Sequence, residues 1–177
     1  MQEIIDLYTV DRIPTGRTWV RGEKLPPDTY RLVVHICIFN SRGEMLIQHR
    51  HPDIVRWPDY WDVSVGGGAS AGDNSRSAAQ RETEEELGLR LDFAGERPMI
   101  TAHFSEGFDD FYAIHADVDP ADLTLQEDEV CEVRWADLAE IEQMIDAGTF
   151  IPYEKDFMRY LFYTAIHRGT WDLDQRK

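Results

Sequence analysis

The sequence predicts an α/β fold in which a mixed β-sheet is covered by helices. Segments rich in β-branched and aromatic residues alternate with segments at helical spacing, and no internal repeat or linker interrupts them. The length of 177 residues suits one compact domain with a sizeable core. We therefore expect a single domain over residues 1–177, in which residues 1–30 form an N-terminal β arm or hairpin.

The first half of the chain contains most of the predicted strands. Residues 3–23 surround the sequence Pro14-Thr15-Gly16, which predicts a short hairpin or extended arm that turns at these residues. Two apolar segments, 31–40 and 45–50, are separated by a turn signal and predict a hairpin in the core. A shorter strand over 61–65 runs into three glycines, where the backbone can turn or lie close to a ligand.

Helical patterns dominate the second half. Residues 137–147 predict a helix that Gly148 ends, and the apolar spacing over 153–167 predicts a longer helix with Gly169 as its stop. Further strands are predicted over 89–105, 109–118 and 129–138.

An acidic helix between these halves has the features of a metal site. Good helix formers lead to Gly88, and three glutamates at i, i+3 and i+4 share one helix face: Glu82, Glu85 and Glu86. Like charges so arranged repel, and a divalent cation would turn this cost into binding, because magnesium and manganese prefer hard oxygen ligands. Arg81 is placed to pair with Glu85 at i+4. The alternative is an ordinary solvated helix face.

The residues around this helix resemble the signature of the Nudix hydrolase family. That signature runs glycine, five residues, glutamate, seven residues, then Arg-Glu-apolar-any-Glu-Glu-any-Gly-apolar. Here Gly67 begins it, Asp73 holds the first acidic position, Thr83 replaces the apolar residue, and the others follow in register: Arg81, Glu82, Glu85, Glu86, Gly88 and Leu89. The resemblance implies a Nudix α/β/α sandwich, magnesium or manganese as cofactor, and hydrolysis of the diphosphate linkage in a nucleoside diphosphate derivative.

The same resemblance implies roles for individual residues. The expected metal ligands are Glu82, Glu85, Glu86 and the carbonyl of Gly67. The first choice for the base that accepts a proton from the attacking water is Glu85, with the loop residues Glu129 and Glu127 as alternatives. Arg81 is expected to hold Glu85 in position.

Substrate contacts are predicted beside the helix. Arg50 ends a core strand and can bind phosphate through a fork of donors, and Gly67 and Gly68 let the backbone approach a ligand. Three aromatic residues before the glycines either stack on a base or cover the core: Trp57, Tyr60 and Trp61.

Asp73 is the main departure from the signature. Asp73 or Asn74 can cap the first turn of the helix, where negative charge is favoured. Because aspartate is one methylene shorter than glutamate, we expect it not to bridge to Arg81.

Composition excludes several other classes of function. The net charge of −16 argues against nucleic-acid binding through a basic surface, and no apolar segment has the length of a membrane span. We expect a cytoplasmic protein whose arm can pair with a second subunit in a homodimer. Cys37 and Cys131 are expected to be buried thiols, and Cys37 would act as a nucleophile only beside a base. His35 is expected in the core, and the scattered histidines do not predict a zinc site.

Two alternatives to hydrolysis remain open. The N-terminal arrangement resembles the Nudix branch that includes isopentenyl diphosphate isomerase, but this chain has Ser64, Val65 and Gly66 where that enzyme carries its catalytic cysteine. The other alternative is a family member that binds a nucleotide or protein without turnover. Asp73 in place of the signature glutamate would then be a sign of lost activity, although all three signature glutamates are present.

Overall fold

The computed structural model of the chain describes residues 3–167. Its strands are β1 Ile4–Tyr8, β2 Pro14–Val20, β3 Arg31–Phe39, β4 Met45–Arg50, β5 Trp61–Asp62, β6 Val65–Gly68, β7 Ile100–Phe104, β8 Gly107–His115 and β9 Val130–Ala136. Its helices are α1 Ser75–Leu87, α2 Leu138–Ala147 and α3 Lys155–His167, with a short 3₁₀ turn at Pro120–Asp122.

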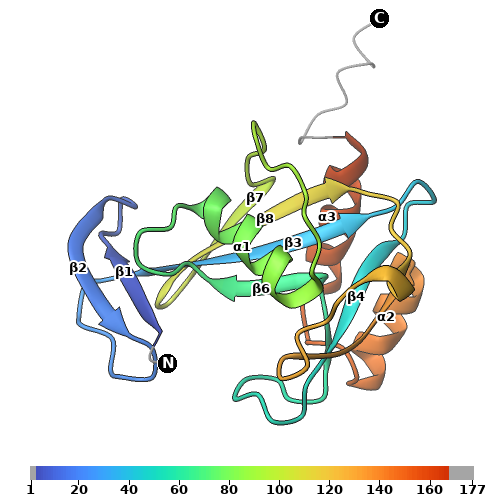
Figure 1. Ribbon diagram of the computed structural model, residues 1–177, viewed down its shortest axis with the longest axis horizontal. Helices are drawn as coiled ribbons and strands as arrows, with labels where there is room; N and C mark the ends of the chain where they lie inside the picture. Colours follow the sequence, from blue (N-terminus) through green and yellow to red (C-terminus); the bar gives the residue numbers. More distant parts are fainter. Residues whose placement is uncertain (1–2, 168–177) are drawn as a thin grey trace, which may run out of the picture.

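Strand β3 is the centre of a mixed, seven-stranded sheet (Figure 1). It runs parallel to β8 along its full length and antiparallel to β6 along its first half. At its far end, Phe39 pairs with Met45 of β4, which also pairs with β5 and β9. On one side of β3, its first half therefore pairs with β6 and its last residue pairs with β4. The glycines of β6 lie beside the first half of β3.

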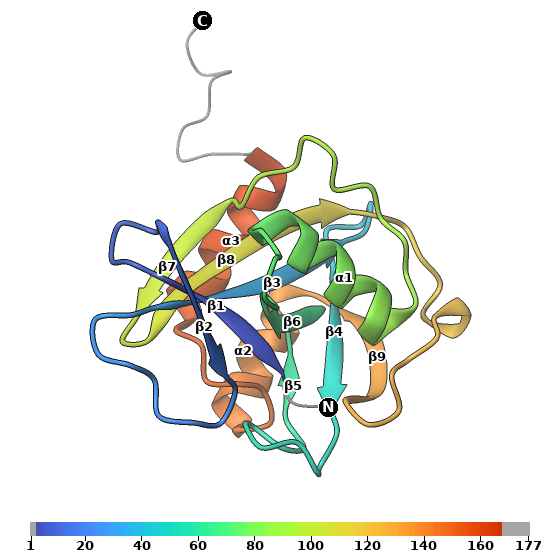
Figure 2. The same ribbon diagram turned by 60° about the vertical axis from the view of Figure 1, so that its left-hand side comes forward.

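Helices cover both faces of the sheet (Figures 1 and 2). Helix α1 packs on one face through Ala78, Ala79 and Leu87, which join a buried cluster of sheet residues. On the opposite face, Met158 and Leu161 of α3 pack with Ile141 of α2. The predicted α/β/α sandwich is confirmed, and its layers place α1 directly over β3 and β6.

The N-terminal segment forms the predicted hairpin, but its turn lies elsewhere. The amide of Arg12 donates to Thr9 O at 3.0 Å, whereas Pro14 and Gly16 lie within β2. The prediction that Pro14-Thr15-Gly16 forms the turn was therefore wrong. Proline is tolerated at the first residue of an edge strand, and β2 pairs with β1 alone among the described strands.

Two other strand predictions also need correction. The segment 61–65 is broken at Val63 and Ser64. The three glycines after it belong to strand β6, so of the two possibilities given for them the turn is not formed. Of the segment 89–105, only Ile100–Phe104 is a strand, while Phe93 fills the core from a loop. Apolar side chains in the core produced a strand-like pattern here without strand pairing.

The helix boundaries agree with the sequence. Asn74 caps α1 by accepting from the amides of Arg76 and Ser77, and Gly88 ends it with a positive φ of 63°. Asp137 and Gly148 bound α2 in the same way. Helix α3 is also formed, while its predicted stop at Gly169 lies outside the described residues.

The two cysteines differ in exposure. Cys37 is buried, whereas Cys131 is exposed, so the expectation that both are buried was wrong for Cys131. Its strand β9 lies at an edge and turns only part of its residues inward. Between residues 3 and 167, none of the helices combines the length and apolar character needed to cross a membrane.

Candidate active site

Helix α1 divides the three signature glutamates into a buried pair and an exposed residue. Glu82 and Glu86 face the sheet and are 9% and 2% exposed, whereas the Glu85 side chain is 52% exposed. Within residues 3–167, no three acidic, histidine or cysteine side chains are already gathered as metal ligands. Glu85 points toward Arg81, which also donates to Glu82 of the buried pair.

Gly67 provides the space that Glu82 occupies. It lies in β6 opposite Val34, and a Cβ atom built on it would overlap the carboxylate of Glu82. A glycine is therefore required for the helix carboxylate to lie directly against the strand backbone.

Burial changes the protonation of the two inner glutamates. Burial raises the pKa of Glu82 to about 7, although Arg81 opposes the shift. The pKa of Glu86 is raised well above its ordinary value by burial and then by the charges of Glu82 and Glu129. Glu86 Oε2 is buried and accepts no hydrogen bond from the described residues. Two crowded carboxylates with a free buried oxygen fit a divalent cation.

Arg81 links the elements of the site. Its Nη1 donates to Glu82 at 3.0 Å and to Glu85 at 2.8 Å, as predicted for Glu85. Its Nη2 donates to the carbonyl of Gly68 at 2.9 Å. Its Nε and Nη2 both donate to Asp73 Oδ2 at 3.0 Å. One guanidinium therefore fixes the strand end, the loop before the helix and two signature glutamates.

The expectation that Asp73 is too short to reach Arg81 was wrong. Asp73 stands on the same side of α1 one residue before its cap, and the long arginine side chain spans the intervening turns. Asp73 also accepts from Ser77 Oγ at 2.9 Å, while Asn74 serves as the cap. The shorter carboxylate thus keeps the supporting role.

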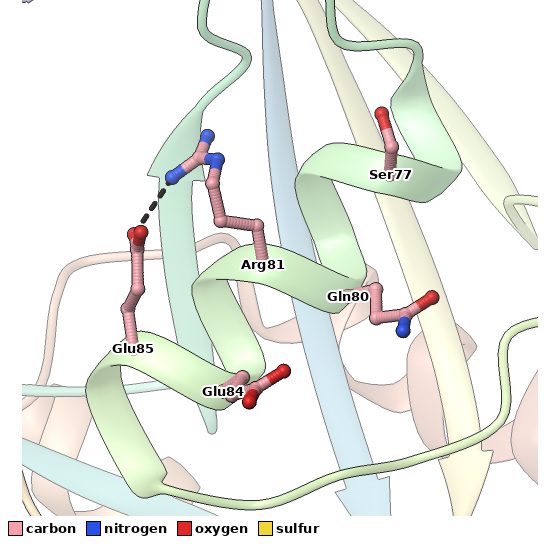
Figure 3. A pocket seen from close by; sticks show the side chains of 5 residues that line it. All are labelled: Ser77, Gln80, Arg81, Glu84 and Glu85. Carbon is pink, nitrogen blue, oxygen red and sulfur yellow. Dashed lines mark hydrogen bonds and ion pairs between the residues drawn. The ribbon is translucent and has the colours of Figure 1, made fainter.

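The outer face of α1 carries a shallow hollow of about 590 Å³ (Figure 3). Arg81 and Glu85 lie along it with their ion pair at 2.8 Å, and Ser77, Gln80 and Glu84 complete its lining. Solvent therefore reaches Glu85 from this side, while Glu82 and Glu86 face the sheet.

Thr83, which departs from the apolar position of the signature, is compatible with the core. It is fully buried, and its hydroxyl donates to the carbonyl of Ala79 at 2.7 Å. Because the helix satisfies the hydroxyl, only the methyl group and the hydrocarbon surface face the core.

Arg50 is held at the side of the buried pair. Its Nη1 lies 3.4 Å from Asp62 Oδ2, its Nη2 donates to the carbonyl of Arg56 at 3.2 Å, and its buried Nε has no partner among the described residues. Asp62 is in turn held by the hydroxyl of Tyr153 at 2.9 Å. The charge of Arg50 partly offsets the raised pKa of Glu86.

The loop after the 3₁₀ turn brings a fourth acid to the site. The amide of Gln126 donates to Glu86 O at 3.0 Å, and the charge of Glu129 in the same loop raises the pKa of both Glu82 and Glu86. Its exposed side chain accepts from Gln126 at 3.1 Å. Glu127 lies exposed in the same turn.

Sequence reasoning missed Gln48, Asp62 and Tyr153. Gln48 is 1% exposed, and its amide partly offsets the raised pKa of Glu86. The available signal was a polar residue directly after the three buried apolar residues of β4. Tyr153 lies far from Asp62 in sequence, so spacing alone could not connect them.

The aromatic residues near the glycines are arranged in different ways. Trp57 is 44% exposed and packs edge-on against Tyr60, with a positive φ of 52°. Trp61 stacks on His49. His35, expected to be a hydrogen-bonded core residue, is only partly buried: it stacks on Phe111, and its buried Nδ1 has no partner among the described residues.

Ser64 has a structural position. Its Oγ accepts from the amide of Ile38 at 2.8 Å and donates to the carbonyl of Leu46 at 2.5 Å, and the residue is fully buried. With both hydrogen-bonding directions used, this hydroxyl links β3 to β4 and is unsuited to attack a substrate.

Comparisons with known proteins find a matching domain family and similar sequences. Residues 29–161 match the NUDIX domain family. The chain is 47% identical over 166 residues to an uncharacterized Nudix hydrolase of Listeria monocytogenes, covering 92% of this chain and 97% of that relative. It is 27% identical over 154 residues to isopentenyl-diphosphate Delta-isomerase of Escherichia coli, covering 82% of each.

A solved structure has the same fold. DR0079 from Deinococcus radiodurans aligns with a TM-score of 0.70 at 22% identity, covering 90% of this chain and 97% of that one. The family match extends from just before β3 into α3 and includes every signature residue. The chain therefore belongs to the Nudix hydrolase family.

Proposed function

We propose that this Nudix hydrolase cleaves the diphosphate linkage of a nucleoside diphosphate derivative by attack of water, with magnesium or manganese as cofactor. The observation that carries the proposal is the buried pair Glu82 and Glu86, in which Glu82 lies against Gly67 and both carboxyls have raised pKa values. Such a pair is costly to ionise unless a cation binds it.

The residues that would hold the cation are Glu82, Glu85, Glu86 and the carbonyl of Gly67. Bound there, the ion would neutralise charge on the diphosphate oxygens and provide a place for the attacking water. Glu86 Oε2 is free for this role, and Glu129 is an additional acid near the same point.

The protein residues perform the remaining work. Glu85, exposed and oriented by Arg81, accepts a proton as the water oxygen attacks phosphorus and the bond from phosphorus to the bridging oxygen breaks. Glu129 is the alternative base. Arg50 supplies a guanidinium for a phosphate, and the backbone of Gly67 and Gly68 lets the substrate approach the strand end.

The isomerase alternative has the support of the Escherichia coli relative. Against it, Ser64 is fixed between strands and Gly66 carries no side chain, so the segment that bears the isomerase cysteine lacks a nucleophile here. A binding module without turnover would need a defect in the acidic site, and Asp73 retains its contact with Arg81.

A substrate panel tests the proposal. Nucleoside di- and triphosphates, nucleotide sugars and dinucleotide polyphosphates are incubated with magnesium or manganese, and released phosphate or nucleoside monophosphate is measured. Glu85→Gln and Glu86→Gln should lower turnover by about 100-fold or more. Glu84→Gln, which removes an acid on the same helix that pairs with Arg90, is the matched control.

The panel also separates the alternatives. Absence of turnover on every substrate with either metal would overturn the hydrolase proposal, and full activity of both glutamine variants would overturn the mechanism. Conversion of isopentenyl to dimethylallyl diphosphate in the same panel would favour the isomerase.

A further inference from the structure

The N-terminal hairpin contacts the loop that leads into α1. This loop, residues 69–74, is called the β6–α1 loop. In Figures 1 and 2 the hairpin lies at the end of the sheet beside this loop. The amide of Ala71 donates to Ile4 O at 2.8 Å, and the amide of Gly72 donates to Asp6 Oδ2 at 2.7 Å. Strand β1 therefore binds two consecutive amides immediately before Asp73.

The carboxylate of Asp6 acts where the loop backbone is unusual. Gly72 has a φ of +90°, a conformation that side-chain-bearing residues rarely adopt. The turn continues with the amide of Asp73 donating to Ser70 O at 2.9 Å. Fixing the Gly72 amide from outside the turn therefore restrains the position of Asp73.

The hairpin is itself anchored to the sheet. Arg12 at its tip donates to both oxygens of Asp110, at 3.0 and 2.7 Å, and the Asp110 carboxylate is fully buried. Thr101 adds a third donor at 2.6 Å. Such a two-bond arginine–carboxylate pair fixes orientation as well as distance. The hairpin is thus fixed at its tip while β1 contacts the loop.

The loop passes this restraint to the glutamates. Asp73 accepts from two nitrogens of Arg81, and Arg81 donates to Glu82 and Glu85. Asp6 is therefore hydrogen-bonded to Gly72, Gly72 is joined to Asp73 by a peptide bond, and Asp73 is hydrogen-bonded to Arg81. Residues 4–20 lie outside the segment that matches the NUDIX domain family.

We propose that Asp6 is a positioning residue of the active site, which holds the β6–α1 loop so that Asp73 orients Arg81 and its glutamates. The inference rests on the proposed function for its catalytic consequence, but the positioning itself is independent of turnover. Partners that orient metal ligands affect metal affinity or activity by about 10- to 100-fold when removed, and Asp6 acts one step further away.

The test compares Asp6→Ala, which removes the acceptor, with Asp6→Asn, which removes the charge and keeps an acceptor oxygen. Asp11→Ala is the matched control, because it removes an exposed acid from the same hairpin. The first readout is the NMR signal of the Arg81 Nε–H in metal-free protein, and the second is Mn²⁺ affinity without substrate. Asp6 is only partly buried, so melting temperature serves to confirm that all three variants fold.

We expect Asp6→Ala to broaden or shift the Arg81 Nε–H signal and to weaken Mn²⁺ binding by about 5-fold to 10-fold. Asp6→Asn and Asp11→Ala should retain both within about twofold of wild type. An unchanged Arg81 signal and Mn²⁺ affinity in folded Asp6→Ala would overturn the inference. Lack of Mn²⁺ binding or turnover by the wild type would instead count against the proposed function, while the Arg81 signal would still decide the role of Asp6.

Discussion

At the scale of single residues, Asp73 decides whether the site is intact. The sequence alone suggested a weakened contact, since the side chain is shorter than the glutamate of the family signature. Arg81 nevertheless reaches Asp73 and donates two hydrogen bonds to its carboxylate at 3.0 Å. The departure is compensated by the length and planar fork of arginine.

Asp73→Glu should leave turnover and metal affinity within about threefold of wild type, whereas Asp73→Ala should lower both by about 10-fold or more, because Arg81 then loses the acid that orients it. Steady-state kinetics and Mn²⁺ titration measure both effects. A gain of several orders of magnitude from Asp73→Glu would show that the natural residue impairs the site.

The raised pKa of Glu82 predicts a pH-dependent stability. The folded protein binds this proton more tightly than the unfolded chain, with a pKa of about 7 against an ordinary value of 4.5. The stabilising contribution is therefore complete below about pH 4.5 and is lost as pH rises through about 7. Metal-free wild type should lose more melting temperature between about pH 5 and about pH 8 than Glu82→Gln does.

Saturating Mg²⁺ should remove that difference, because bound cation stabilises the ionised carboxylate. Melting curves recorded with EDTA and with Mg²⁺ measure it. Identical pH dependence of the wild type and Glu82→Gln in EDTA would contradict the assigned protonation.

At the scale of elements, the sequence predicted the helices more closely than the strands. Both ends of a helix depend on hydrogen bonds between residues close in sequence, so Asn74 and Gly88 could be identified from the sequence around them. Strand pairing depends on distant partners. For this reason the sequence left open a turn or a close approach to a ligand at the three glycines, which in fact pair with β3. Phe93 was placed in a strand, although it fills the core from a loop.

Asn74 is the cap of α1, and its side chain is expected to stabilise the start of this helix. Asn74→Ala removes acceptors for the amides of Arg76 and Ser77 and should lower the free energy of unfolding by about 1 kcal/mol. Asn74→Asp should preserve it, since aspartate is an equally good cap. Urea unfolding measures both, and equal losses for the two variants would show that the side-chain acceptor is not what stabilises this helix end.

The residues of the site also divide into those that are local in sequence and those that are distant. The signature letters identified Arg81 and the glutamates, because these residues follow one another on a single helix. Gln48, Asp62 and Tyr153 come from three other segments, and only the folded sheet brings them to Glu86 and Arg50. The contact of Asp6 with Gly72 spans 66 residues and has no sequence signature.

At the scale of the whole molecule, the net charge of −16 opposes an anionic substrate. Added salt screens this repulsion, so kcat/KM at saturating Mg²⁺ should rise about two- to fivefold as NaCl increases from about 20 to about 200 mM. The rise should come from a lower KM, while kcat stays nearly constant. A fall in kcat/KM with salt would mean that local positive charge, such as Arg50, dominates the approach of substrate.

Assembly into a homodimer stays a prediction. The sequence suggested that the arm can pair with a second subunit, and in the structure β1 of this arm contacts the β6–α1 loop of its own chain. Strand β2 pairs only with β1 among the described strands, so its other edge is where a second copy would pair. Light scattering coupled to size-exclusion chromatography measures the mass, and a mass near 20.5 kDa would exclude the dimer.

The proposed hydrolysis depends on divalent-cation binding by the buried glutamates of α1. This binding is tested most directly by Mn²⁺ titration, followed by electron paramagnetic resonance, of the wild type, a Glu82→Gln/Glu86→Gln double variant and Glu84→Gln. Wild type and Glu84→Gln should bind Mn²⁺ with equal affinity, and the double variant should lose binding by about 100-fold or more. Undiminished Mn²⁺ binding by the folded double variant would contradict this role of the buried glutamates.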